Sequence, residues 1–176
     1  MNKVTLLTGG SRSGKSRYAL EIASHYRHKA FIATAEPLDD EMQMRISHHK
    51  EERGLDFVTI EESVDLAGAI RALPADTEVA VVDCLTVWVG NLMYKLGDDE
   101  ENYSQIDDLL QVLKSPPCDI VLVTNEVGMG IIPDNAMSRR FRDLAGNLNQ
   151  RVAAIADRVI ITISGIPLTL KDGDRE

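Results

Sequence analysis

The sequence contains a phosphate-binding octapeptide of the pattern G-x-x-x-x-G-K-[S/T], made of Gly9, Gly10, Ser11, Arg12, Ser13, Gly14, Lys15 and Ser16. Gly9 and Gly14 permit the backbone bends that turn amide N–H groups toward phosphate oxygens. Lys15 can place its ammonium group on the β- and γ-phosphates, and Ser16 can place its hydroxyl on Mg²⁺. We therefore predict that the chain binds a nucleoside triphosphate.

The residues on either side of the octapeptide supply the strand and the helix that such a loop needs. An apolar run, Val4 to Thr8, precedes it, and apolar residues follow at helical spacing, namely Ala19, Ile22, Ala23 and Tyr26. The helix would direct the positive end of its dipole at the phosphates. A glycine turn before an ordinary helix is the alternative, and this context disfavours it.

A candidate metal ligand follows another apolar run. Val79 to Val82 precede Asp83, as in a Walker-B strand, in which the carboxylate holds Mg²⁺ directly or through water. A helix N-cap or a turn aspartate after a buried strand is the alternative. Ser16 and Asp83 are thus the candidate metal-side ligands.

The segment Thr124 to Gly130 reads Thr-Asn-Glu-Val-Gly-Met-Gly and comes directly after a further apolar run. Its polar residues and glycines are candidates for binding a second substrate, because loops at strand ends carry many binding residues. A plain connecting loop is the alternative.

Two adjacent histidines, His48 and His49, lie in a segment whose acidic start, Asp39 to Glu41, is typical of a helix N-terminus. His49 shares a helical stripe with Met42, Ile46 and Arg53, whereas His48 is rotated from it by about 100°. A histidine beside a triphosphate can attack phosphorus as a nucleophile. Surface or half-buried histidines on an amphipathic helix are the alternative, and helix geometry does not decide between the two.

Strand and helix signals alternate along the chain, which predicts the α/β class. Strands are expected at Lys3–Thr8, Ala30–Thr34, Phe57–Ile60, Glu78–Asp83, Asp119–Thr124 and Arg158–Ser164. Several are continuous Val/Ile/Leu runs, so we expect a mostly parallel central sheet with helices on both faces. Two of the helices are expected after caps at Ser63 and Asn135. In such sheets the ligand lies beyond the carboxyl ends of the strands.

The length of 176 residues fits one domain with a single core. We expect one nucleotide-binding catalytic domain over residues 1–170 and a disordered acidic tail over residues 171–176. The hydrophobic content of 44% and the charged content of 27% are typical of a soluble globular protein.

Charge and cysteine content restrict the partners and the compartment. The net charge of −9 opposes binding to nucleic acid or to an anionic membrane, which favours small-molecule substrates. No apolar segment is long enough to span a bilayer, and the strand at the N-terminus argues against a cleavable signal peptide. Cys84 and Cys118 have no metal-ligand spacing and suit apolar core positions in a reducing cytoplasm.

Several stretches together resemble the bifunctional adenosylcobinamide kinase/adenosylcobinamide-phosphate guanylyltransferase family of cobalamin biosynthesis. They are the octapeptide, Ile32–Thr34, Leu38–Met42, Arg45–Ile46, His48–Lys50, Val121–Ile131 and Phe141–Gly146. The resemblance runs from the first predicted strand to Gly165. The paired histidines before a lysine and the Thr124–Gly130 stretch are more specific than the octapeptide. The fold class expected is accordingly that of a RecA-like P-loop NTPase.

The resemblance implies two reactions on the aminopropanol arm of a corrinoid. Adenosylcobinamide is phosphorylated on its hydroxyl by ATP or GTP, and GMP is then transferred from GTP to the new phosphate, which gives adenosylcobinamide-GDP and pyrophosphate. The family forms a GMP-histidine intermediate, which the match places on His49, with His48 as the second choice. Lys15 and Mg²⁺ would stabilise the departing pyrophosphate, with Ser16 and Asp83 on the metal side.

Further nucleotide contacts are implied at Ala33, Thr34, Ala35, Lys50, Glu51, Glu52, Arg53 and Glu61. Glu61 can accept hydrogen bonds from guanine N1–H and the 2-amino group, although a glutamate at a helix start is its alternative interpretation. The family forms compact homo-oligomers, of which a trimer is the form expected here.

Three other functions are compatible with the phosphate loop. A monofunctional guanylyltransferase would label with GTP but leave cobinamide unphosphorylated. A generic P-loop kinase for a small alcohol would need no histidine. A nucleotide-binding regulator without enzymatic activity would need no loop for a second substrate.

Overall fold

The computed structural model describes residues 2–37, 39–40, 43–44, 47, 56–97 and 103–173. The strands are β1 (Val4–Gly9), β2 (Lys29–Ala33), β3 (Phe57–Glu61), β4 (Val79–Asp83), β5 (Asp119–Val123), β6 (Arg158–Ile163) and β7 (Ile166–Asp172). The helices are α1 (Lys15–Ala23), α3 (Leu66–Arg71), α4 (Leu85–Leu96), α5 (Ser104–Leu113) and α6 (Ala136–Ile155). Each predicted strand is present, with its ends shifted by at most one residue.

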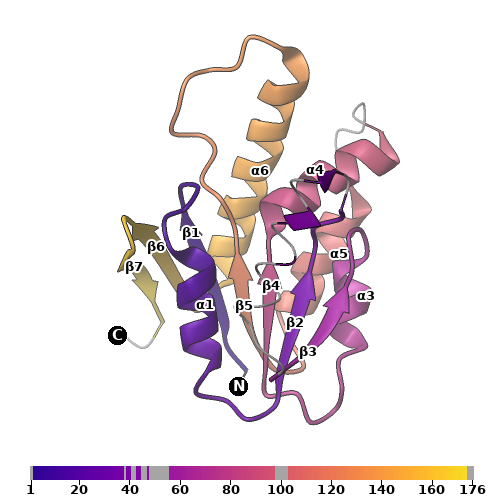
Figure 1. Cartoon of the computed structure of the whole chain (residues 1–176), viewed down its shortest axis with the longest axis vertical. Coiled ribbons are helices and arrows are strands. Elements are labelled where there is room, and N and C mark those ends of the chain that lie inside the picture. Colours follow the sequence, from indigo (N-terminus) through magenta and orange to yellow (C-terminus); the bar gives the residue numbers. More distant parts are fainter. Residues whose placement is uncertain are drawn as a thin grey trace.

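The strands form one sheet in the order β3-β2-β4-β5-β1-β6-β7 (Figure 1). All neighbouring pairs are parallel except β6 and β7, which are antiparallel. The prediction of a mostly parallel α/β sheet is therefore confirmed. The order places β1, and with it the phosphate loop, in the interior of the sheet between β5 and β6.

Helices cover both faces of the sheet, as predicted. On one face, α1 packs on alternate strand residues that include Leu7, Val81 and Val121. On the other face, α3, α4, α5 and α6 enclose a larger core that includes Leu6, Val82 and Trp88. Successive residues of one strand thus enter opposite cores, which explains why the central strands are apolar at nearly every position.

The two predicted helix caps have different outcomes. Asn135 caps α6, because its Oδ1 accepts a hydrogen bond from the backbone N–H of Ser138 at 2.8 Å. Ser63 does not cap α3. The cap is Asp65, whose Oδ1 accepts from Gly68 N–H at 2.8 Å, while Ser63 donates its hydroxyl to Glu36. The prediction for Ser63 was wrong because a carboxylate two residues later fills the same role.

Three further elements complete the fold, namely α4, α5 and β7. Seven residues of α4 are buried, so it lacks the polar stripe by which a surface helix is recognised. β7 includes Lys171 and Asp172, and Gly173 donates its N–H to the carbonyl of Asp157 at 2.8 Å. The predicted disordered tail was therefore wrong for residues 171–173, because the turn after β6 folds them back onto the sheet. Residues 174–176 lie outside the described part of the chain.

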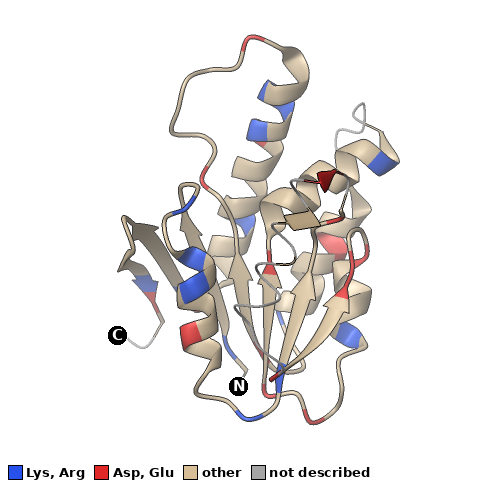
Figure 2. Ribbon diagram, viewed as in Figure 1, with Lys and Arg blue, Asp and Glu red and all other residues tan. Residues whose placement is uncertain are grey.

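Acidic and basic residues alternate along the ribbon of the described chain, and arginines gather on the outer half of α6 (Figure 2). Arg139, Arg140 and Arg142 belong to this part of the helix. Within the described residues, no helix combines the length and the apolar character that a bilayer crossing requires.

Candidate active site

The phosphate loop connects β1 to α1, and its two predicted hinge glycines have positive φ angles. Gly9 has φ 144° and Gly14 has φ 97°. A Cβ added to Gly9 would lie 2.4 Å from the carbonyl oxygen of Thr162, and one added to Gly14 would lie 3.2 Å from Gly165 Cα. Only glycine satisfies both the backbone angle and the space at Gly9.

Lys15 is the first residue of α1 and is 6% exposed. Its Nζ donates to the carbonyl of Gly10 at 2.5 Å and to Ser13 Oγ at 3.3 Å. Burial lowers the pKa of the ammonium group, and the opposing effects come from Cys84 and Asp83. Because burial raises the pKa of Cys84 to about 12, that residue is a neutral thiol at pH 7. Asp83 is thus the anion that favours the charged form of Lys15.

The phosphate loop is fixed by contacts with β6, the turn after it and the residues after β5. The hydroxyls of Ser13 and Thr162 share a buried hydrogen bond of 2.8 Å, and Gly165 N–H donates to the Ser13 carbonyl at 2.9 Å. On the other side, Glu126 N–H donates to the Gly9 carbonyl at 2.9 Å. Thr162 could not be predicted as part of this site, because no local pattern relates it to a loop 149 residues away.

The carboxyl ends of four neighbouring strands meet in one row, as the prediction of the ligand edge requires. Glu61 pairs with Ala33, Ala33 with Asp83, and Asp83 with Val123. Asp83 is half-buried and its charge acts on Lys15. The strand register therefore brings the predicted metal ligand and the predicted guanine contact to the same edge as the phosphate loop.

Thr34, predicted as a nucleotide contact, lies in the interior at this edge. Its hydroxyl donates to the Cys84 carbonyl at 2.9 Å and accepts from Cys84 N–H at 2.8 Å. Its own N–H donates to the Asp83 carbonyl, and its carbonyl accepts from Asn91 Nδ2. With these groups committed to protein partners, Thr34 positions the end of β4. Ala33 and Ala35 are half-buried beside it.

The loop after β5, Thr124 to Gly130, is held at its start by a buried polar network. Thr124 Oγ1 donates to Asn149 Oδ1 at 2.8 Å, and Asn149 Nδ2 donates to the Asn125 carbonyl at 3.3 Å. Thr86 Oγ1 accepts from Asn125 N–H at 2.7 Å. The network fixes the first two residues, while Gly128, Met129 and Gly130 are exposed.

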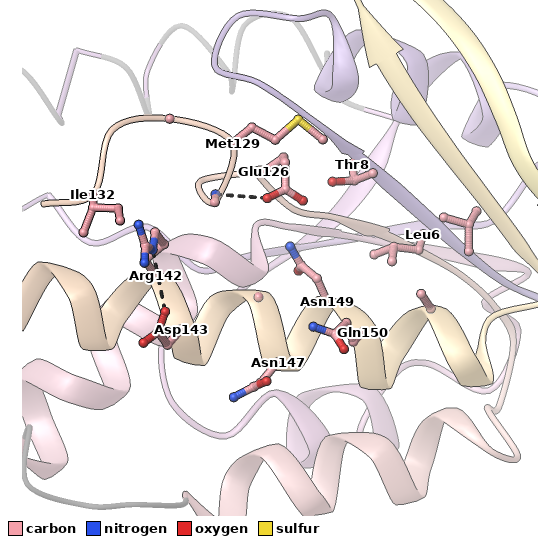
Figure 3. A pocket seen from close by; sticks show the side chains of 15 residues that line it. Leu6, Thr8, Glu126, Met129, Ile132, Arg142, Asp143, Asn147, Asn149 and Gln150 are labelled. Atoms are coloured by element: carbon pink, nitrogen blue, oxygen red, sulfur yellow. Dashed lines mark hydrogen bonds and ion pairs between the residues drawn. The ribbon is translucent and has the colours of Figure 1, made fainter.

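This loop forms the rim of an open cavity of about 960 Å³ (Figure 3). Its floor comes from β1 and β6, through Leu6, Thr8 and Val159, and one wall comes from α6. Glu126 lies at the mouth, and its Oε1 accepts from Gly128 N–H at 3.0 Å. Thr8, which lines the cavity, directly precedes the first residue of the phosphate loop.

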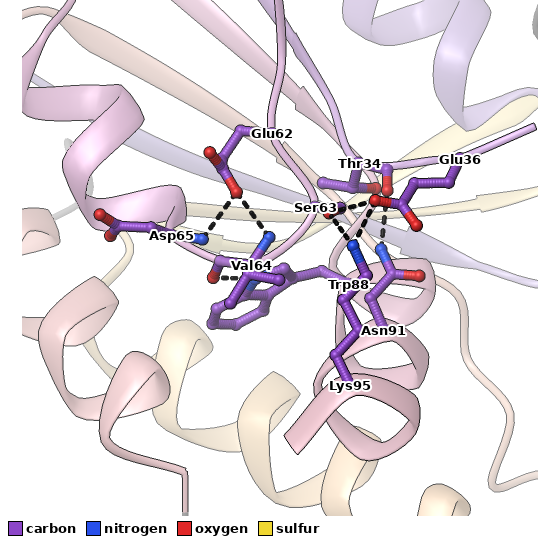
Figure 4. A network of polar contacts seen from close by, with 9 residues as sticks. All are labelled: Thr34, Glu36, Glu62, Ser63, Val64, Asp65, Trp88, Asn91 and Lys95. Atoms are coloured by element: carbon purple, nitrogen blue, oxygen red, sulfur yellow. Dashed lines mark hydrogen bonds and ion pairs between the residues drawn. The ribbon is translucent and has the colours of Figure 1, made fainter. Parts of the chain in front are cut away.

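A polar cluster fixes the chain just after β2 (Figure 4). Ser63 Oγ donates to Glu36 Oε1 at 2.6 Å, and Lys95 Nζ donates to both groups. The hydrogen bonds from Lys95, which has the larger effect, and from Ser63 hold the pKa of Glu36 below its usual value. The cluster joins three elements that are distant in sequence, so no sequence pattern could have identified it.

The predicted nucleophiles and the nucleotide contacts on the same predicted helix lie outside the described residues. They are His48, His49, Lys50, Glu51, Glu52 and Arg53. Their roles stay predictions. Ser47 and Asp56 are the described residues on either side of this segment.

Comparisons with known proteins find relatives over nearly the whole chain. The family model described as cobinamide kinase / cobinamide phosphate guanyltransferase matches residues 5–170. The bifunctional adenosylcobalamin biosynthesis protein CobU of Salmonella typhimurium is 43% identical, over 94% of this chain and 98% of that protein. The bifunctional adenosylcobalamin biosynthesis protein CobP of Pseudomonas aeruginosa is 40% identical, over 94% and 96%.

The RadB recombinase has a similar solved structure, with a TM-score of 0.51 at 16% identity, over 90% of this chain and 73% of that one. At this identity the likeness shows the fold alone, which is that of a RecA-like P-loop NTPase. The family match, in contrast, covers nearly the whole chain. This chain belongs to the cobinamide kinase / cobinamide phosphate guanyltransferase family.

Proposed function

We propose that this chain catalyses two consecutive reactions on adenosylcobinamide. In the first, the aminopropanol hydroxyl loses its proton and attacks the γ-phosphorus of ATP or GTP, and ADP or GDP leaves with the bridging oxygen. In the second, the resulting phosphate receives GMP from GTP, and pyrophosphate is released. One observation carries the proposal: a family match from residue 5 to residue 170 that includes a complete phosphate loop of the required geometry.

In the kinase step, the loop amides and Lys15 would hold the transferred phosphoryl group in line with the acceptor hydroxyl. Lys15 Nζ lies within the loop and donates to Gly10 O and Ser13 Oγ. When the nucleotide binds, phosphate oxygens would replace these two acceptors. Burial strengthens its interaction with an anion, because less water competes for the charge.

In the guanylyl step, we assign the nucleophile to His49. A neutral imidazole nitrogen attacks the α-phosphorus, the bond from that phosphorus to the bridging oxygen breaks, and pyrophosphate leaves with the electron pair. The P–N bond of the intermediate then breaks when an oxygen of the substrate phosphate attacks the same phosphorus. His48 is the second choice, because it is the neighbouring residue and offers the same chemistry.

The donor groups at the phosphate loop fit Mg²⁺. Ser16 offers a hydroxyl and Asp83 a carboxylate, which are the hard oxygen ligands that Mg²⁺ prefers. An ion held by these two residues would take its other ligands from phosphates and water. When bound, Mg²⁺ would neutralise charge on the phosphate oxygens.

We assign guanine recognition to the edge formed by β2 and β3. Glu61 is exposed at the end of β3 and pairs in register with Ala33 at the end of β2. Its carboxylate would accept from guanine N1–H and the 2-amino group. Ala33, Ala35 and residues 50–53 are the further proposed contacts, whereas Thr34 acts through the position of β4.

Labelling with α-³²P-GTP tests the proposal. The protein should acquire an acid-labile, base-stable label that is lost in His49→Ala and retained in His48→Ala. The opposite pattern would transfer the nucleophile to His48. A label without phosphorylation of cobinamide by ATP or GTP would establish a monofunctional guanylyltransferase, and phosphorylation without a label would establish a simple kinase.

We further propose that the enzyme works in the cytoplasm as a homotrimer. The two cysteines are buried free thiols, which suits a reducing compartment. Light scattering coupled to size-exclusion chromatography would test the oligomeric state, and a monomeric mass would contradict it.

A further inference from the structure

The geometry points to the cavity between β1, α6 and the loop after β5 as the binding site of the corrinoid acceptor, with side-chain amides that recognise the carboxamides at the edge of the macrocycle. This inference rests on the proposed function and adds to it the place of the second substrate. The cavity, of about 960 Å³, lies at the upper end of the usual size range of small-molecule sites, which is about 300–1,000 Å³.

Thr8 supplies the first indication of a ligand. The residue is only 9% exposed, and its buried side-chain oxygen has no hydrogen-bond partner among the described residues. Buried hydroxyls are almost always paired, so an unpaired one calls for an explanation. Thr8 lines the cavity, and Figure 3 shows its side chain on the side of Glu126. A polar group of a bound molecule would provide the missing partner.

The α6 wall presents amide groups to the same space. Asn147 and Gln150 line the cavity, and both are exposed with no hydrogen bond from their side-chain amides to other described residues, so these amides are accessible to a ligand (Figure 3). They are three residues apart and therefore neighbours on the helix surface. A primary amide donates and accepts at once, so it pairs with another primary amide through two hydrogen bonds. Corrinoids carry such carboxamides around their ring.

Part of the remaining lining is apolar, although the charged side chains of Glu126, Arg142 and Asp143 also line the cavity. Leu6 and Val159 form the apolar floor, and Met129 at the rim is 79% exposed. An exposed methionine on a loop can adapt its shape to a bulky ligand. An apolar floor suits the hydrocarbon parts of the corrin ring, and amides on one wall suit the carboxamides that project from its edge.

The position of the cavity explains how one bound corrinoid could serve both reactions. Thr8 directly precedes Gly9, and Glu126 at the cavity mouth donates its N–H to the Gly9 carbonyl. The cavity and the phosphate loop therefore share the end of β1. A ring held in the cavity would leave its aminopropanol arm free to extend across this short boundary toward the bound triphosphate.

Gly146 provides a test that spares the fold. It lies in α6 on the cavity wall, and a Cβ added there would meet no atom within 4 Å. Gly146→Leu should therefore retain or improve helix stability while filling the cavity. Ala154→Leu, at an exposed position of the same helix, is the matched control. Gln150→Leu and Thr8→Val remove individual polar contacts with little change of shape.

The measurements are the dissociation constant for adenosylcobinamide by equilibrium dialysis, followed by corrin absorbance, together with the KM for GTP and the melting temperature. We expect Gly146→Leu to weaken corrinoid binding at least ten-fold, and Gln150→Leu and Thr8→Val about three- to ten-fold, with the KM for GTP unchanged. Ala154→Leu should match the wild type.

Unchanged corrinoid binding in Gly146→Leu and Gln150→Leu would overturn the inference while the proposed function stands. A raised KM for GTP with normal corrinoid binding would also overturn it, because the cavity would then belong to the nucleotide. Failure of the wild-type protein to bind or phosphorylate adenosylcobinamide would instead remove the proposed function itself, and this inference with it.

Discussion

The hydroxyl oxygens of Ser13 and Thr162 lie 2.8 Å apart, and this buried contact joins the phosphate loop to β6. Since Lys15 Nζ also donates to Ser13 Oγ, one serine connects the proposed phosphate-binding cation to a strand from the far end of the chain. Thr162 thus acts as a positioning residue for Lys15. The shape of the phosphate loop therefore depends on a strand at the opposite end of the domain sequence.

Thr162→Val should weaken nucleotide binding. The change removes the hydroxyl, keeps the side-chain shape and leaves Ser13 with one partner fewer, at a cost of about 1 kcal/mol. If the lost hydrogen bond destabilises the nucleotide-bound form of the loop by this amount, the KM for GTP rises about five-fold. Steady-state kinetics with thermal melting would measure both effects.

Thr169→Val, at an exposed position of β7, is the control and should change neither quantity. An unchanged KM in Thr162→Val together with a lowered melting temperature would assign Thr162 to stability alone.

Lys15→Met should abolish activity while leaving the fold intact. Loss of the loop cation should reduce the rate of both reactions at least about 100-fold, as for the loss of other transition-state donors. The ammonium group is buried and its pKa is lowered, so its charge opposes folding at neutral pH. We therefore expect Lys15→Met to be at least as stable as the wild type at pH 7.

The pH dependence of this stability difference has a definite sign. In the window between the lowered pKa of the folded state and the usual value of 10.5, the unfolded chain binds more protons than the folded one. Wild-type stability relative to Lys15→Met should consequently rise as the pH rises through that window. Denaturant unfolding at pH 7 and pH 10 would measure it, and a difference that moves the other way would contradict the burial effect.

The cluster of Glu36, Ser63 and Lys95 should stabilise the chain after β2 in a pH-dependent way. Lys95 and Ser63 lower the pKa of Glu36, so the stabilisation is present above the usual value of 4.5 and is lost as the pH falls through the lowered pKa. The two charged side chains are 33% and 31% exposed, so we expect a coupling below about 1 kcal/mol.

A double-mutant cycle with Glu36→Gln and Lys95→Met, measured by urea unfolding at pH 7 and pH 3, would determine this coupling. It should be favourable at pH 7 and smaller at pH 3. Equal coupling at both values would show that the charge of Glu36 contributes nothing to the contact.

The sequence predicted those parts of the fold that depend on local periodicity and on glycine. Apolar runs identified the six parallel strands, and the spacing from Gly9 to Ser16 identified the phosphate loop. Asn135 was predictable as a cap because its side chain binds a neighbour three residues away. Each of these features is encoded within about ten consecutive residues.

The missed features depend on contacts between distant residues. The segment Ile166–Leu170 has an apolar residue at every second position, which is a strand pattern, but Pro167 and the polar residues that follow weaken it, and the pairing with β6 makes β7 a strand. Thr34 resembles a ligand contact in sequence, yet the approach of Cys84 takes up its hydroxyl. The cavity is lined by residues of β1, α6 and the loop after β5, so it depends on the packing of elements that are distant in sequence.

Asp83→Asn should separate the two tasks that we assign to this carboxylate. If Asp83 holds the metal, the amide variant will need a higher Mg²⁺ concentration for half-maximal activity, because an uncharged oxygen binds the ion more weakly. If Asp83 also supports the charge of Lys15, its loss will lower the pKa of Lys15 further, since its negative charge raises that pKa in the folded protein. The alkaline limb of the rate profile at saturating Mg²⁺ will then shift to lower pH. Asp108→Asn, exposed on α5, is the control for both readouts. A shifted alkaline limb with unchanged Mg²⁺ dependence would leave Asp83 as a partner of Lys15 and exclude it as a metal ligand.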